Sequence, residues 1–270
     1  MPERLRPWPP ALAGLAVPRW LAGLPGSLPR LAPRLLAALL PSRCALCGMD
    51  CEGVVCRSCR DQYAAARACR CARCANPLPA PPADARAGPV VCGACLGNPP
   101  DFDASVVAVD YAAPLDQLVL QLKFGARLAL APWFAQLLVD AVLAQRGAAL
   151  PDLLCPVPLG AGRLVERGFN QALEIAKPLS AALGIALYPT LAARTTETLA
   201  QSGVAPSERA SNIRGAFAVT DPDRIAGRHV GLVDDVMTSG HTLGELAAAC
   251  KRFGAARVTN LVFARTPPHS

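Results

Sequence analysis

The chain has 270 residues, of which 52% are hydrophobic and 5% aromatic, and its formal net charge is +7 at pH 7. This length is enough for one α/β domain and a smaller module. No apolar run reaches the roughly 18 residues that a membrane-spanning helix needs. Prolines interrupt the N-terminal stretch that would otherwise resemble a signal peptide. We therefore expect a cytoplasmic protein without a membrane span.

The excess positive charge lies in the first third of the chain. Residues 1–98 hold 12 arginines and 5 acidic residues, whereas residues 99–270 hold 15 basic and 15 acidic residues. An excess made only of arginine is compatible with a nucleic-acid or acidic partner. The alternative, which we favour, is that these arginines offset the negative charge of metal-bound thiolates.

Composition divides the chain into three zones. Residues 1–40 are rich in Pro, Leu, Ala and Arg, and we expect them to be partly disordered with a short helix. Residues 41–98 hold ten of the twelve cysteines and few large aliphatic residues, which predicts a small module held together by metal. Residues 99–270 alternate β-like and helical patterns, which predicts an α/β domain.

The cysteines of the second zone form a CxxC…CxxC unit twice. The first unit is Cys44, Cys47, Cys56 and Cys59, and the second is Cys71, Cys74, Cys92 and Cys95. Two thiolates separated by two residues reach one tetrahedral ion from a tight turn, and two such pairs complete a four-cysteine site. We therefore predict two structural zinc sites whose closed ligand shells leave no position for a substrate.

Two alternatives compete with zinc. A disulfide framework requires an oxidising compartment, for which the sequence offers no export signal. Redox-active CxxC pairs are the weaker alternative, because four of them in one short segment have no use as separate centres. Cys51 and Cys69 lie beside the two units, and either can replace a neighbouring ligand. Cys155 and Cys250 fall on a predicted strand and helix, where we expect plain buried thiols.

The predicted elements of the third zone alternate between strands and helices. In chain order they are a strand at 105–112, helices at 114–125 and 128–145, a strand at 153–159, a helix at 170–184, a strand at 229–235, a helix at 242–254 and a strand at 257–264. Strands that alternate with helices of 10–15 residues indicate a parallel sheet with crossover helices.

The segment 229–242, HVGLVDDVMTSGHT, predicts a buried strand, a loop rich in hydroxyl groups and the start of a helix. Asp234 and Asp235 end the strand, where open α/β sheets place their ligand sites. The Thr and Ser hydroxyls that follow, the backbone amides and the positive helix N-terminus converge on an anion. Gly240 lets the backbone approach that anion closely. A phosphate cradle beside two acids that accept hydrogen bonds from sugar hydroxyls describes a site for ribose 5-phosphate.

Two alternatives compete for this segment. An ordinary capped helix after a strand explains the Thr and Ser residues but leaves the paired acids without a reason. A nucleotide site of the Walker type requires a GxxxxGK[ST] loop, and the chain contains none.

The run VGLVDDVMTSGHT resembles the signature with which type I phosphoribosyltransferases bind 5-phosphoribosyl pyrophosphate (PRPP). With the doubled cysteine unit, CPVPL at 155–159, ERGFNQA at 166–172, the spacing Arg194…Gln201…Arg209…Asn212 and GAF at 215–217, the chain resembles the ComF family of competence-associated proteins, which includes GntX-like proteins. The resemblance runs from about residue 44 to 265. It implies a type I phosphoribosyltransferase-like parallel sheet flanked by helices and preceded by a double zinc ribbon.

The resemblance also implies roles for individual residues. Asp234 and Asp235 would hold the ribose hydroxyls, and the loop that follows would hold the 5-phosphate. Arg163 and Arg167 follow the segment 156–159 and would face the leaving pyrophosphate as catalytic residues together with the two acids. The full set expected to bind PRPP is Asp234, Asp235, Val236, Met237, Thr238, Ser239, Gly240, His241, Thr242 and Lys123. A solvated helix start for the two arginines, and a surface position for the lysine, are the alternatives.

Further implications concern the loop, the ion and the acceptor. Residues 194–214 resemble the mobile loop that closes over PRPP and excludes water. Mg²⁺ is expected with PRPP, because it prefers phosphate oxygens and water to an all-protein cage. The chain ends soon after the last predicted strand, so we expect any hood over the acceptor to come from residues 44–125.

Two classes of function follow, and a third option, a zinc-stapled scaffold with a vestigial PRPP site, is disfavoured by the intact signature. The first is an enzyme that transfers phosphoribosyl to an unknown nitrogen acceptor, associated with DNA uptake. The second is a non-catalytic PRPP- or nucleotide-binding adaptor that docks a competence helicase, another DNA-uptake protein or single-stranded DNA. The shortage of aromatic residues for base stacking argues against direct strand binding.

Overall fold

A computed structural model describes residues 42–64, 69–79, 90–145, 149–195 and 215–267. The expected helix within residues 1–40 lies outside these described ranges, and so do residues 196–214 of the expected loop 194–214. The described residues from Arg43 onward belong to one compact unit, Arg43–Ser270. Within the described residues, no helix combines the length and the apolar character needed to cross a lipid bilayer.

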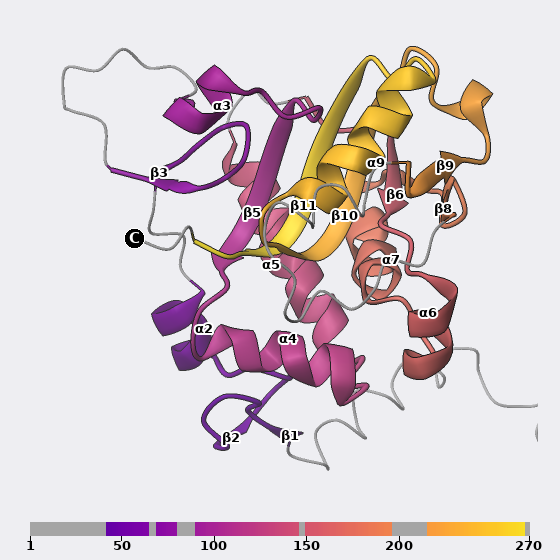
Figure 1. Cartoon of the computed structure of the whole chain (residues 1–270). Coiled ribbons are helices and arrows are strands. Elements are labelled where there is room, and N and C mark those ends of the chain that lie inside the picture. Colours follow the sequence, from indigo (N-terminus) through magenta and orange to yellow (C-terminus); the bar gives the residue numbers. More distant parts are fainter. Residues whose placement is uncertain (1–41, 65–68, 80–89, 146–148, 196–214, 268–270) are drawn as a thin grey trace, which may run out of the picture. The chain divides into compact units, whose positions relative to one another are not determined.

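A five-stranded parallel sheet forms the centre of this unit (Figure 1). In spatial order its strands are β5 (Ala104–Asp110), β11 (Arg257–Arg265), β10 (His229–Met237), β6 (Leu153–Pro156) and β7 (Ala186–Leu187). The two longest strands, β10 and β11, are buried almost throughout, as parallel strands covered on both faces must be. The predicted parallel sheet is therefore confirmed.

Helices cover both faces of the sheet and create two separate cores. The helices are α4 (Leu115–Phe124), α5 (Leu130–Ala144), α6 (Ala161–Arg167), α7 (Gln171–Leu183) and α9 (His241–Arg252). One core joins the sheet to α4, α5 and α7, and contains the stacked rings of Phe134 and Phe263. The other joins the opposite face to α9 through Leu243 and Leu246.

The predicted boundaries hold to within a few residues, with one clear exception. The strand expected at 153–159 ends at Pro156, and the chain leaves the sheet there. The amide of Val157 still donates to the carbonyl of Val233 at 2.9 Å. Pro158 has no N–H to donate, so the ladder cannot continue. The residues that follow are therefore a loop over the ends of the strands.

Short elements were missed because their sequences are too brief to show a period. They are α2 (Arg57–Tyr63), α3 (Gly93–Gly97) and α6, the 3-10 helix η2 (Pro222–Arg224), and the strands β1 (Ser42–Arg43), β2 (Asp50–Cys51), β3 (Cys69–Arg70), β4 (Pro77–Leu78), β7, β8 (Ala192–Arg194) and β9 (Phe217–Val219). β8 pairs antiparallel with β9, which follows residues 196–214 in the chain.

The two cysteine units share one architecture. In each, a two-stranded ribbon carries the first CxxC pair, and a short helix begins at the second pair. Cys44 and Cys59 belong to the core under α4 and α5, whereas Cys71, Cys74 and Cys95 belong to the core under α9. The two zinc-ribbon-like units therefore brace opposite faces of the same sheet.

Candidate functional site

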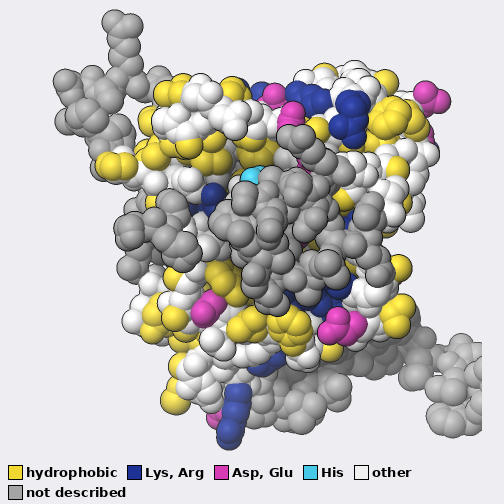
Figure 2. Space-filling view, in the orientation of Figure 1, with side chains coloured by type: hydrophobic (Ala, Val, Ile, Leu, Met, Phe, Trp, Pro, Cys, Tyr) yellow, Lys and Arg dark blue, Asp and Glu magenta, His cyan; other side chains and the backbone are white. Residues whose placement is uncertain are grey.

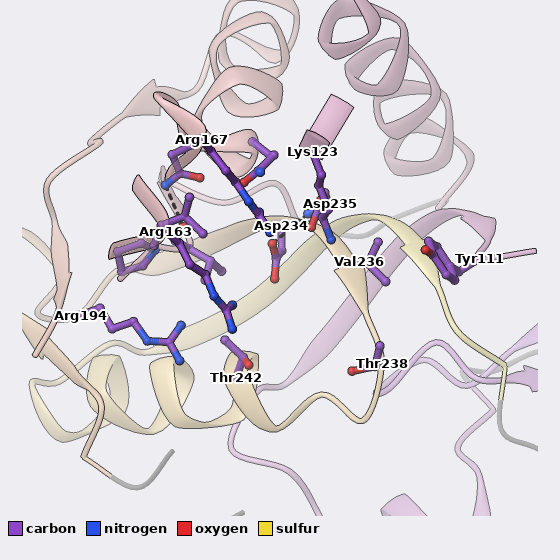
Figure 3. A pocket seen from close by; sticks show the side chains of 15 residues that line it. Tyr111, Lys123, Arg163, Arg167, Arg194, Asp234, Asp235, Val236, Thr238 and Thr242 are labelled. Atoms are coloured by element: carbon purple, nitrogen blue, oxygen red, sulfur yellow. Dashed lines mark hydrogen bonds and ion pairs between the residues drawn. The ribbon is translucent and has the colours of Figure 1, made fainter. Parts of the chain in front are cut away.

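A cavity of about 300 Å³ opens where β6 and β10 end (Figure 3). It is lined by Tyr111, Lys123, Val157, Pro158, Leu159, Arg163, Arg167, Asn170, Gln171, Arg194, Asp234, Asp235, Val236, Thr238 and Thr242. Its volume lies at the lower end of the range for small-molecule sites, about 300–1,000 Å³. Its position is the carboxyl edge of a parallel sheet, where open α/β folds bind ligands.

Asp234 and Asp235 form the floor of the cavity and differ in environment. Asp235 is 5% exposed, and its Oδ2 lies 2.9 Å from Nζ of Lys123 on α4. Burial, together with the neighbouring charge of Asp235, raises the pKa of Asp234 to about 8. The amide of Asp235 donates to Oδ1 of Asp234 at 2.9 Å. One acid is therefore paired with a lysine, and the other is held close to neutral.

Three arginines reach the cavity from separate segments. Arg163 and Arg167 come from α6, and Arg194 comes from the end of β8 (Figure 3). The guanidinium of Arg167 lies 5.1 Å from the ring centroid of Phe124. Burial and the charge of Arg163 lower the pKa of Arg194, while the carboxylate of Asp234 opposes this shift. The cavity, which we call the cationic cavity, thus has four cationic side chains against two carboxylates, one of which is largely protonated near neutral pH.

Residues 237–242, which we call the hydroxyl loop, separate this cavity from a second one. Thr238 and Thr242 line the cationic cavity. Ser239, Gly240 and His241 instead line a cavity of about 510 Å³ on the other side. Gly240 has φ +83°, and a Cβ there would lie 2.7 Å from Cε of Met237.

Not every expected ligand residue therefore faces the cationic cavity. Met237 is 2% exposed and packs into the core under α9, so its side chain supports the loop from below. Because the sheet period places alternate residues on opposite faces, Met237 points away from the face that Val236 shares.

The expected site residues did not include Asn170, Gln171 and Tyr111, and Arg194 was expected only as the first residue of the loop 194–214. Asn170 caps α7 by accepting from the amide of Ala172 at 2.9 Å, and its Nδ2 donates to the carbonyl of Val157 at 3.0 Å. Gln171 is 2% exposed, and its Nε2 has no hydrogen-bond partner among the described residues. The signal was present, because Asn170 and Gln171 lie in the ERGFNQA motif.

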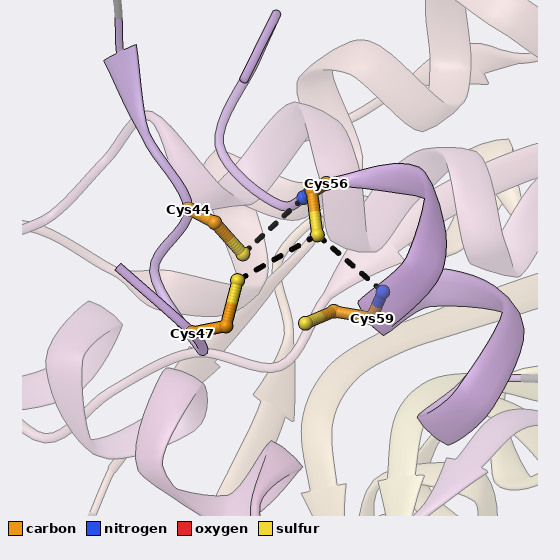
Figure 4. A group of neighbouring side chains, drawn as sticks. All are labelled: Cys44, Cys47, Cys56 and Cys59. Atoms are coloured by element: carbon orange, nitrogen blue, oxygen red, sulfur yellow. Dashed lines mark hydrogen bonds between the residues drawn. The ribbon is translucent and has the colours of Figure 1, made fainter. Parts of the chain in front are cut away.

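The eight predicted metal ligands fall into two groups. The first cysteine group is Cys44, Cys47, Cys56 and Cys59 (Figure 4), and the second cysteine group is Cys71, Cys74, Cys92 and Cys95. Within each group all sulfur atoms lie within 4.8 Å of one another. The sulfurs of Cys47 and Cys56 are 3.8 Å apart. Tetrahedral Zn–S bonds of about 2.3 Å place sulfurs about 3.8 Å apart, so both groups fit such an ion.

Backbone amides prepare each group for a metal. The amide of Cys56 donates to Sγ of Cys44, and that of Cys92 donates to Sγ of Cys71, both at 3.3 Å. Burial alone would raise the thiol pKa values, but hydrogen bonds from several backbone amides, led by those of Cys47 and Cys74, outweigh it and lower the pKa of Cys44 and of Cys71 to about 6. Each group therefore contains one thiol that ionises readily.

The remaining cysteines lie outside the two groups, and all twelve are free thiols, which disfavours the disulfide alternative. Sγ of Cys51 donates to the carbonyl of Gly53 at 3.3 Å instead of joining the first group. Cys155 and Cys250 are buried in the core under α9, and burial raises the pKa of Cys250 to about 11.

The chain is similar to proteins named for DNA utilisation and competence. It is 39% identical over 178 residues to DNA utilization protein YhgH of Escherichia coli K12, covering 65% of this chain and 78% of that protein. It is 32% identical over 171 residues to Competence protein F of Haemophilus influenzae, covering 62% and 75%. No family model matches the chain.

Two solved structures align with about half of this chain. One is the allosteric regulatory enzyme of purine biosynthesis, with 18% identity and a TM-score of 0.31, covering 49% of this chain and 25% of that one. The other is glutamine PRPP amidotransferase from B. subtilis in complex with ADP and GMP, with 19% identity and a TM-score of 0.30, covering 51% and 26%.

Proposed function

We propose that this chain, which belongs to the ComF family of competence-associated proteins, binds PRPP with Mg²⁺ in the cationic cavity and transfers phosphoribosyl to a nitrogen acceptor in the context of DNA uptake. The observation that carries the proposal is the meeting of three arginines, two acids and two threonine hydroxyls in one cavity.

The distribution of charge matches a ligand with two phosphoryl groups and a sugar between them. Thr242 lies in the first turn of α9 and Thr238 lies in the loop before it, where the helix dipole and unpaired amides favour a phosphate. Arg163 and Arg167 come from α6 and supply charge for a pyrophosphate. Asp234 lies on β10 and is suited to hydrogen bonds with ribose hydroxyls.

The donor set also fits a magnesium ion that arrives with the ligand. The cavity offers two carboxylates, and Asp235 is already engaged by Lys123 at 2.9 Å. Such a site cannot form an all-protein cage, whereas Mg²⁺ commonly takes one or two carboxylates together with phosphate oxygens and water. Asp234 is the residue that would hold it, in exchange for the proton that it keeps near neutral pH without the ion. When bound, the ion neutralises charge on the pyrophosphate.

The chain's own residues then act on a developing separation of charge. As the bond between C1′ and the pyrophosphate oxygen lengthens, negative charge grows on the leaving group and positive charge grows on the sugar. Guanidinium groups fixed in place stabilise the leaving pyrophosphate most when it is fully charged. Stacking on Phe124 limits the motion of Arg167 before the ligand arrives.

We further propose that both cysteine groups hold zinc as a structural ion. The sulfur separations and the amide donors to Sγ support this, and each group has four ligands and no open position. Metal binding would then contribute to folding of the two ribbons, which contain few large apolar residues.

A non-catalytic adaptor is the second candidate, favoured by the names of the relatives, which speak of DNA utilisation and competence and not of a reaction. In that case the same cavity binds PRPP or a nucleotide, and the partner is a DNA-uptake protein or single-stranded DNA. Both candidates require ligand binding in the cationic cavity.

Calorimetric titration of the zinc-loaded protein with PRPP and Mg²⁺ tests the shared claim. We expect saturable binding that Asp234→Ala or Arg163→Met weakens at least about tenfold, equivalent to 1.4 kcal/mol. Asp223→Asn, on the exposed η2, is the control and should bind as the wild type does. Absence of binding by the wild type would exclude both candidates.

Release of pyrophosphate in the presence of a panel of nitrogenous bases separates the enzyme from the adaptor. Turnover that depends on one class of base supports transfer. Binding of PRPP without turnover, together with a shift of single-stranded DNA that weakens as salt rises, supports the adaptor.

A further inference from the structure

Arg265, the last residue of β11, is a buried cation whose partners are backbone carbonyls. It is 5% exposed, and no carboxylate pairs with it in the part of the chain that the structure describes. Nε donates to the carbonyl of Cys74 at 3.1 Å, and Nη1 donates to that of Met237 at 3.1 Å. Nη1 also donates to the carbonyls of Thr238 and Thr266.

These contacts place one side chain between the second cysteine group and the hydroxyl loop. Cys74 is a predicted metal ligand, while Met237 and Thr238 begin the loop. The planar guanidinium fork can hold both sides at once because its donors point in fixed directions. A lysine ammonium has no such fork and cannot reproduce the arrangement.

The same contacts orient the amides of the loop. In a trans peptide the C=O and the following N–H point in opposite directions. Since the carbonyls of Met237 and Thr238 are drawn to Arg265, the N–H groups of Thr238 and Ser239 point away from it. Arg265 lines the cavity of about 510 Å³, and Thr238 lines the cationic cavity on the other side of the loop.

One apolar side chain also meets the loop on that side, because a Cβ on Gly240 would lie 3.7 Å from Cζ of Phe102. Ser239, Gly240 and His241 border the larger cavity, so side-chain packing does not fill the space between them and the second cysteine group. The hydrogen bonds of Arg265 are the contacts that join the loop to the second cysteine group across this space. The metal matters because it would fix the turn that carries the carbonyl of Cys74, and four thiolates around a divalent ion carry a formal charge of −2 beside the buried guanidinium.

The first cysteine group has a different environment. It belongs to the core under α4 and α5, and its helix α2 is tied to α5 by the ion pair of Arg60 with Asp140 at 2.6 Å. This group braces the face of the sheet opposite α9. Its loss would remove packing from that face without touching the hydroxyl loop.

We infer that Arg265 is a positioning residue that couples metal in the second cysteine group to the hydroxyl loop, so that losing this metal loosens the loop and weakens anion binding. Losing metal from the first cysteine group should leave the loop ordered. The statement about anion binding rests on the proposed function, whereas the statement about loop order does not.

Amide hydrogen exchange tests loop order without any ligand. The amide of Thr266 donates to Met237 at 3.0 Å, and that of Gly244 donates to Gly240 at 2.8 Å, so both report on the loop's anchors. In Arg265→Met we expect both to exchange at least about tenfold faster than in the wild type, with both metals retained. Arg265→Lys should loosen the loop too, and serves if the methionine variant fails to fold.

Arg70→Met is the matched control. Arg70 contacts the same cysteine ribbon, donating to the carbonyl of Ala75 at 3.2 Å and pairing with Asp110 at 2.9 Å, and neither partner belongs to the hydroxyl loop. Its replacement should leave the two reporter amides protected. Equal loosening in both variants would mean that the ribbon as a whole, and not Arg265, orders the loop.

A second exchange experiment tests the role of the metals. It compares Cys95→Ser, which lacks a ligand of the second cysteine group, with Cys59→Ser, which lacks a ligand of the first. Each should lose one metal equivalent by elemental analysis, but only Cys95→Ser should reproduce the exchange pattern of Arg265→Met. If Cys59→Ser loosens the loop as much, the coupling runs through global stability and the inference is wrong.

Titration with PRPP and Mg²⁺ then tests the consequence for the ligand. If the wild type binds, Arg265→Met and Cys95→Ser should each weaken binding at least about tenfold, and Cys59→Ser less than about threefold. A loosened loop with unchanged affinity would refute the link to anion binding. If the wild type does not bind, the proposed function is lost, and the exchange experiment alone decides the role of Arg265.

Discussion

Replacing Asp234 by asparagine should stabilise the protein at alkaline pH and leave it nearly unchanged at acidic pH. The carboxyl has an ordinary pKa of 3.8 and a pKa of about 8 in the folded state. Between these values the folded chain holds a proton that the unfolded chain has released. The contribution of Asp234 to the free energy of unfolding is therefore fully present below about pH 4. It falls as the pH rises towards 8 and stays constant above that.

The size of the effect follows from the two pKa values. One pKa unit corresponds to 1.36 kcal/mol, so the full interval sets an upper bound of roughly 6 kcal/mol. Asp234 is only partly buried and faces a cavity that admits water, which screens the ionised form. We therefore expect about 1–3 kcal/mol. Asparagine keeps the shape and the hydrogen-bonding oxygen but never ionises.

Urea unfolding at pH 5.5 and pH 8.5 measures this difference. The gain in unfolding free energy of Asp234→Asn over the wild type should be larger at pH 8.5 by about 1–3 kcal/mol. Both proteins carry the same cysteines, so any pH dependence of metal binding cancels in the comparison. Asp223→Asn should show no such trend. A gain that is the same at both pH values, or a loss at pH 8.5, would refute the reasoning.

Three further predictions concern residues around the cavity. Lys123→Met removes the partner of buried Asp235 and should lower the unfolding free energy by about 2–4 kcal/mol, and adding Asp235→Asn should restore most of it in a double-mutant cycle. Asn170→Ala removes the cap of α7 and the tie to Val157, and should lower the midpoint of thermal unfolding by an amount equivalent to about 1 kcal/mol while weakening PRPP binding. Phe124→Ala removes the exposed ring beneath Arg167, so it should weaken PRPP binding about two- to fivefold in a calorimetric titration with little change in stability.

The sequence predicted those parts of the site that a short local pattern encodes. The strand, acids and hydroxyls around Asp234 lie within one uninterrupted run, and the cysteine spacing specifies which thiols can share an ion. Such patterns follow from backbone periodicity and from the reach of a tight turn. For this reason β10, β11 and both cysteine groups have the expected composition.

The missed parts depend on contacts between distant segments. Arg194 enters the cavity only because β8 pairs with β9, which comes later in the chain. Arg265 ends a strand, and the residues around it in the sequence do not predict its contact with Cys74, which lies 191 residues earlier. The hydroxyl loop looked like a single ligand-binding unit, but alternation along the chain sends Met237 into the core and leaves Ser239 on another cavity.

The strand order carries a consequence for how the chain folds. β11, which is made late, lies between β5 and β10, and the buried bond from Asn260 to Ser105 joins residues 155 positions apart. The apolar strand β5 therefore has no sheet partner until almost all of the described chain has been synthesised. Pairing over such a distance is slow and leaves an intermediate prone to aggregation. The cysteine ribbons are synthesised before β5 and close short loops. Metal uptake can therefore give the nascent chain an ordered segment before β11 is available to pair with β5.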